Sequence, residues 1–72
     1  MPATRDEIAA AFGQQAQRYG YRRASVGDVA RALHISKQTI YEQFGSKRGL
    51  YRASVELWAA RQRQRVESLL TE

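Results

Sequence analysis

The sequence contains no cysteine and a single histidine among its 72 residues. Without cysteine, neither a disulfide nor a thiolate metal site can support the fold. The sequence also lacks paired carboxylates at a useful spacing and a glycine-rich phosphate loop, which are the patterns that carry most catalytic and cofactor chemistry. We therefore expect no enzyme activity, no metal site and no cofactor.

Long apolar segments are missing as well. No apolar run approaches the roughly 18–20 residues that a membrane span needs, and the first residues, MPATRDE, lack the basic and apolar segments of a signal peptide. A hydrophobic content of 43% with 26% charged residues is typical of a globular domain. We expect one cytoplasmic domain over residues 1–72, with a small core and no membrane association.

Hydroxyl caps and apolar spacing predict four helices and no strand. Thr4 with Glu7 fits a capping box, and the serines at 25, 36 and 46 each precede a helical pattern. In the first helix, the inward face is expected to carry Ile8, Phe12, Ala16 and Tyr19. The expected helices cover about residues 5–19, 26–33, 37–44 and 47–70.

The segment 25–44 has the pattern of two helices that cross at a tight turn. Ala30 is small where the second helix would cross the first, and His34 stands where the turn needs a left-handed residue, which histidine tolerates better than most side chains. Ile40 follows ten positions after Ala30 and is expected to face inward. The predicted fold is all-α: a three-helix, homeodomain-like helix-turn-helix unit plus a long fourth helix.

The outer face of the third helix is made of hydrogen-bonding side chains: Lys37, Gln38, Thr39, Tyr41 and Gln43. Residues 18–52 hold eight basic and two acidic side chains, a net charge of +6. This combination is typical of a helix in the major groove of DNA. Gln38 is expected to pair with adenine, Lys37 to contact guanine or a phosphate, and Thr39 to offer its methyl group to thymine.

Residues 20–50 resemble the N-terminal DNA-binding domain of TetR-type transcriptional repressors. The resemblance rests on GY at 20–21, ISK at 35–37, TIY at 39–41 and FGSK at 44–47, and it extends over about residues 5–58. It implies a transcriptional regulator, expected to be a repressor, that binds a palindromic operator in double-stranded DNA.

The resemblance also implies further contacts with DNA. Tyr41, Gln43 and Lys47 are expected at phosphates or base edges, and Ser25 and Ser36 at phosphates beside helix N-termini. For the two serines, capping alone is the main alternative, and for Tyr41 the alternative is packing.

Some positions depart from the family pattern. His34 replaces the usual glycine, and Arg48 stands where an acidic residue is common. Glu42 occupies a position where aromatic or polar residues are commoner, and its carboxylate would repel a phosphate or select the amino group of cytosine. Because the sequence stops at Glu72, we expect the family's ligand-binding domain to be absent.

The fourth helix has two apolar stripes. Residues 50, 53, 54 and 57 are expected to close the core, whereas a second stripe has nothing in the domain to cover it: Val55, Trp58, Val66 and Leu69. This second stripe suggests a homodimer through the fourth helix or contact with a missing C-terminal domain. The alternative function is a helical interaction module that binds an acidic partner through the fourth helix.

Overall fold

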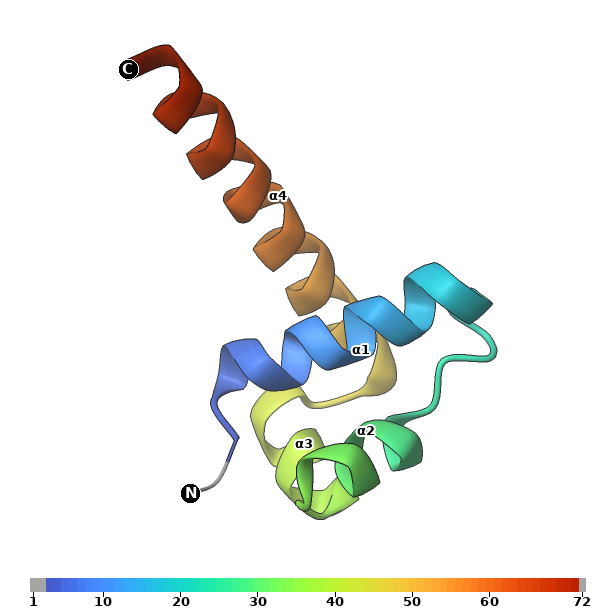
Figure 1. Ribbon diagram of the computed structural model, residues 1–72. Helices are drawn as coiled ribbons and strands as arrows, with labels where there is room; N and C mark the ends of the chain where they lie inside the picture. Colours follow the sequence, from blue (N-terminus) through green and yellow to red (C-terminus); the bar gives the residue numbers. More distant parts are fainter. Residues whose placement is uncertain (1–2, 72) are drawn as a thin grey trace.

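Four helices follow one another along the chain in this computed structural model, which describes residues 3–71. They are α1 (Arg5–Tyr19), α2 (Val26–Leu33), α3 (Lys37–Phe44) and α4 (Lys47–Thr71) (Figure 1). Residues 3–71 form no strand. The fold is therefore all-α, as predicted, and its helices have the expected bounds except that α4 continues one residue further.

Local hydrogen bonds explain where the helices begin. Each one follows a hydroxyl side chain that accepts a hydrogen bond from the backbone N–H three residues later: Thr4, Ser25, Ser36 and Ser46. The Glu7 carboxylate accepts a bond from the Thr4 N–H in return, which completes the predicted capping box. A cap of this kind stabilises a helix by about 0.5–2 kcal/mol, so the caps fix the boundaries of two helices that are only eight residues long.

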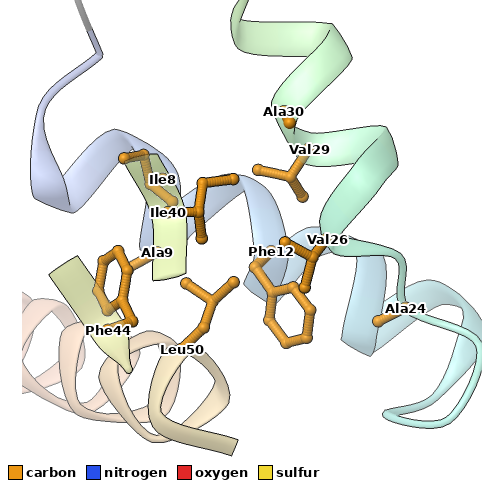
Figure 2. Packing of buried hydrophobic residues seen from close by; sticks show 10 residues of the cluster. All are labelled: Ile8, Ala9, Phe12, Ala24, Val26, Val29, Ala30, Ile40, Phe44 and Leu50. Carbon is orange, nitrogen blue, oxygen red and sulfur yellow. The ribbon is translucent and has the colours of Figure 1, made fainter. Parts of the chain in front are cut away.

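All four helices contribute to one hydrophobic core. The largest side chains with less than 2% exposure are Phe12, Ile8, Ile40, Leu50 and Val29. Figure 2 shows Phe12, Ile40 and Leu50 converging between the helices, with Phe44 beside Ala9. α1 packs against both α2 and α4, and α3 packs against α2 and α4. The core therefore fixes α3 from its inner side.

The predicted inner face of α1 is right for Ile8 and Phe12 and wrong for Tyr19, which is 50% exposed. Tyr19 lies in the last turn of α1, where this helix extends past the elements that it packs on (Figure 1). Its ring lies beneath the Arg18 guanidinium, at 5.6 Å from the ring centroid. A neighbouring tyrosine, Tyr21, makes the aromatic contact with α4 instead, since its ring centroid lies 5.1 Å from that of Tyr51.

The long helix α4 leaves the core about halfway along its length. Leu50 and Ser54 are buried, whereas every described residue from 63 onward is exposed, and this half projects away from the other helices (Figure 1). The expected division into two stripes is confirmed: Val55, Trp58, Val66 and Leu69 are all exposed. Among residues 3–71, no helix combines the length and apolarity needed to cross a membrane.

Candidate nucleic-acid interface

The turn between α2 and α3 holds the two helices in a helix-turn-helix arrangement. His34 adopts the predicted left-handed conformation, with φ 59° and ψ 42°. The next residue, Ile35, donates its backbone N–H to the Ala30 carbonyl oxygen at 2.9 Å, which closes the end of α2. α3 then begins after Ser36 and is anchored by Ile40 and Phe44, both buried.

The outer face of α3 remains open to solvent. Lys37, Gln38 and Gln43 are exposed, Tyr41 is 41% exposed, and Thr39 is partly buried. The exposure of Tyr41 shows a ring that is neither buried in the core nor fully solvated. Five of the predicted DNA-contacting residues thus lie along one short helix whose opposite side is fixed in the core.

Glu42, whose carboxylate was expected to repel a phosphate or to select the amino group of cytosine, lies at the centre of this outer face. At about 100° per residue, Glu42 points about 180° away from the midpoint between the buried Ile40 and Phe44. Gln38 lies one turn earlier, and its Nε2 donates a hydrogen bond to Glu42 Oε1 at 3.1 Å. Helical phase alone would have placed Glu42 at the outermost position.

The two predicted phosphate-contacting serines have structural partners. Ser25 Oγ accepts from the Asp28 N–H at 3.1 Å, and Ser36 Oγ accepts from the Thr39 N–H at 3.0 Å. The Ser36 and Thr39 hydroxyl oxygens also lie 2.9 Å apart, within hydrogen-bond distance. Both serines are therefore caps in this structure, and each helix start keeps further backbone N–H groups for an anion.

Lys47 lies at the first residue of α4 and connects it to the loop before α2. Its Nζ donates to the Arg22 carbonyl oxygen at 3.2 Å and lies 4.8 Å from the centroid of the Tyr21 ring. An ammonium group has three N–H donors, so this tether does not use all of its capacity. Lys47 is thereby held against the backbone of Arg22, an exposed residue.

Arg5 holds the far end of α3, a contact that the sequence analysis missed. Its Nη1 donates to the Gln43 carbonyl oxygen at 3.0 Å, and its guanidinium carbon lies 4.3 Å from the centroid of the Phe44 ring. The two partners are 38 residues apart in the chain, so no local sequence pattern predicts the contact. Arg5 satisfies a carbonyl oxygen in the last turn of α3, where intrahelical donors are lacking.

The exposed charged residues of the helix-turn-helix and of the segments that flank it are mainly basic. Lys37, Arg22, Arg23 and Arg48 are exposed, while Arg31 is paired with Asp28 on α2. The described residues hold no group of histidine, aspartate or glutamate side chains arranged to hold a metal ion. The site thus combines the polar outer face of α3 with exposed basic residues in the segments on either side of the helix-turn-helix.

This arrangement agrees with the comparison to known families. Residues 8–54, well over half of the chain, match the model of a family described as bacterial regulatory proteins, tetR family. The match includes all of α2 and α3, most of α1 and the first turns of α4. No curated protein and no solved structure matches the chain.

Proposed function

Since the chain belongs to the tetR family of bacterial regulatory proteins, we propose that it binds specific sequences of double-stranded DNA with α3 in the major groove. The family is one of DNA-binding transcription regulators. The observation that carries the proposal is the exposed polar face of α3, set opposite the buried Ile40 and Phe44. The major groove of DNA admits one α-helix, and each base pair presents a distinct pattern of donors and acceptors there.

The residues of α3 and its borders have different parts in this proposal. Gln38 pairs with adenine, Lys37 contacts guanine or a phosphate, and the Thr39 methyl group contacts thymine. The remaining contacts go to phosphates or base edges and orient the helix on the duplex: Tyr41, Gln43, Lys47, Ser25 and Ser36. The serines act through the N-termini of the helices that they cap.

We propose repression as the mode of regulation: a protein bound to an operator that overlaps a promoter excludes the polymerase. The alternative function, an interaction module for an acidic partner, is not favoured by the family to which the chain belongs. The two functions differ in their response to DNA sequence, because an interaction module has no preference among duplexes.

Selection from a random duplex library, followed by titration at several salt concentrations, tests the proposal. We expect one enriched sequence motif, which persists in the presence of competitor DNA, and an affinity that falls by orders of magnitude from low to physiological salt. Lys37→Gln should reduce the slope of log K against log salt by about one if Lys37 neutralises a phosphate. Arg63→Gln, the same loss of charge on the far half of α4, is the matched control. Equal binding to all duplexes would refute sequence-specific recognition.

We also propose that two copies pair through the exposed stripe of α4 and bind a palindromic operator. Val55 and Leu69 each lie seven residues from Gln62, and Trp58 and Val66 each lie four residues from it. Antiparallel pairing about Gln62 therefore sets Val55 against Leu69 and Trp58 against Val66. The stripe is complementary to itself, as a two-fold interface requires.

Sedimentation of the chain tests the pairing. We expect a dimer, and we expect Trp58→Arg to sediment as a monomer because it places a charge opposite Val66. Arg52→Gln changes an exposed residue outside the stripe and should leave the dimer unchanged. A wild-type chain that sediments only as a monomer would contradict pairing through α4 without affecting the proposed contacts of α3.

A further inference from the structure

We infer that Glu42 determines which bases this protein accepts, by selecting a base that carries an amino group and by orienting Gln38 beside it. The inference rests on the proposed placement of α3 in the major groove. It starts from the position of Glu42, which is exposed and points directly away from the core side of α3. The side of α3 that points away from the core is the side that can enter a groove.

The contact between Glu42 and Gln38 determines which hydrogen-bonding groups of Gln38 remain available to a base. Gln38 Nε2 donates one of its two N–H groups to Glu42 Oε1 at 3.1 Å. The other N–H and the Oε1 of Gln38 stay available, and together they match the N7 acceptor and the N6 amino donor of adenine. Glu42 thereby fixes the amide in an orientation suited to adenine.

The carboxylate of Glu42 itself can only accept hydrogen bonds when it is ionised. Cytosine presents an amino donor in the major groove, whereas guanine presents two acceptors. A cytosine facing Glu42 gains a hydrogen bond, and a guanine in its place meets a negative charge with its own acceptors. The geometry therefore favours cytosine at the position facing Glu42 and rejects guanine there.

The charge of Glu42 is not compensated within the protein. In the part of the chain that the structure describes, no basic side chain forms an ion pair with its carboxylate, whereas Arg31 pairs with Asp28 on α2. Glu42 is also the one carboxylate on α3. An uncompensated negative charge lowers affinity for every duplex through repulsion by phosphates, and a correctly placed amino group offsets part of this cost. Glu42 thus lowers the affinity for DNA of any sequence and raises the discrimination between bases.

Two substitutions separate reading by Glu42 from orientation of Gln38. Glu42→Gln keeps an oxygen that accepts from Gln38 and removes the charge, so it should relax the cytosine position and preserve the adenine position. Glu42→Ala removes both functions, so it should relax both positions. Glu56→Gln removes an exposed carboxylate from α4 and is the matched control.

The experiment selects binding sites for each variant from one random duplex library and then titrates the preferred duplex and its single-base variants. For the wild type, exchange of the C·G pair for G·C should weaken binding by about 5- to 150-fold, the usual cost of a mismatched pair. In Glu42→Gln, exchange of the C·G pair for G·C should weaken binding much less, and unrelated duplexes should bind more tightly than they bind the wild type. Glu56→Gln should behave as the wild type. Equal helical circular dichroism in all variants shows that folding is unchanged.

The outcomes separate this inference from the proposed function. A wild-type motif that stays the same at every position in Glu42→Gln overturns the role of Glu42 and leaves sequence-specific binding intact. A wild-type protein that enriches no motif overturns the proposed function and, with it, this inference. A cytosine position lost in Glu42→Gln, with the adenine position retained, supports both.

Discussion

Replacing Arg5 with methionine should weaken the attachment of α3 to the rest of the domain. The guanidinium donates to the Gln43 carbonyl oxygen at 3.0 Å and covers the Phe44 ring at 4.3 Å. A cation–π contact at an exposed site contributes about 0.5–1 kcal/mol. The hydrogen bond adds a similar amount, since water can replace the lost donor at this exposed position. Methionine keeps an apolar stem over Phe44, so the expected loss is about 1–2 kcal/mol.

Thermal unfolding followed by circular dichroism measures this loss. In a domain of this size, 1 kcal/mol shifts Tm by about 4–8 °C, so Tm should fall by about 5–15 °C. Hydrogen exchange gives a local test, because the Gly45 N–H donates to the Tyr41 carbonyl oxygen at the end of α3 and should exchange faster in the variant. Arg5→Lys keeps the positive charge but lacks the planar guanidinium. Its Tm and its rate of Gly45 exchange should therefore lie between those of the wild type and those of Arg5→Met.

The matched control is Arg63→Met, which makes the same change at an exposed residue on the free half of α4. It should leave both Tm and the exchange of Gly45 unchanged. If Arg5→Met and Arg63→Met unfold at the same temperature, the contacts of Arg5 contribute nothing to the stability of α3. A role of Arg5 in positioning the outer face of α3 is then refuted.

Substitutions at three other positions have expected outcomes. His34→Gly should raise stability by about 0.5–1 kcal/mol, because glycine adopts the left-handed conformation at φ 59° without steric cost; a melting curve in which His34→Ala gains as much would contradict this. Gln38→Ala should cost about 1–3 kcal/mol of binding on the preferred duplex and relax one base position; equal weakening on all duplexes would show that Gln38 does not contact a base. Ser36→Ala should lower stability by about 1 kcal/mol, and Ser36→Gly by less, since glycine is a tolerable N-cap; unchanged unfolding in Ser36→Ala would mean that the cap is dispensable.

The helix boundaries were predictable because they are determined locally. Each capping hydroxyl accepts from an N–H only three residues away, and the left-handed turn at His34 is a property of a single residue. The inner positions of α2 and α3 follow from helical periodicity, which is why Ile40 was correctly expected in the core. Tyr19 obeys the same periodicity but lies in the last turn of α1, where it is half exposed.

Contacts between distant segments were not predictable in this way. Arg5 meets Gln43 across 38 residues and Lys47 meets the Arg22 carbonyl across 25. Sequence spacing carries no information about either contact, because each depends on how α1 and α4 lie against the other helices. Glu42 is a different case, since its phase opposite Ile40 and Phe44 is a local property. Its carboxylate suggested repulsion of a phosphate or selection of cytosine, but not the hydrogen bond from Gln38.

The predicted DNA-contacting residues differ in how much of the fold depends on them, and this difference decides what their substitution can show. Ser25 and Ser36 cap helices, and Lys47 tethers α4 to a loop, so their removal alters stability together with any contact to DNA. Gln38 has its hydrogen bond to Glu42 within the same exposed face of α3, and neither side chain supports the core. A change in base preference after substitution of Gln38 or Glu42 therefore reports on recognition itself, whereas loss of binding after substitution of a cap or the tether has two causes that only a parallel measurement of stability can separate.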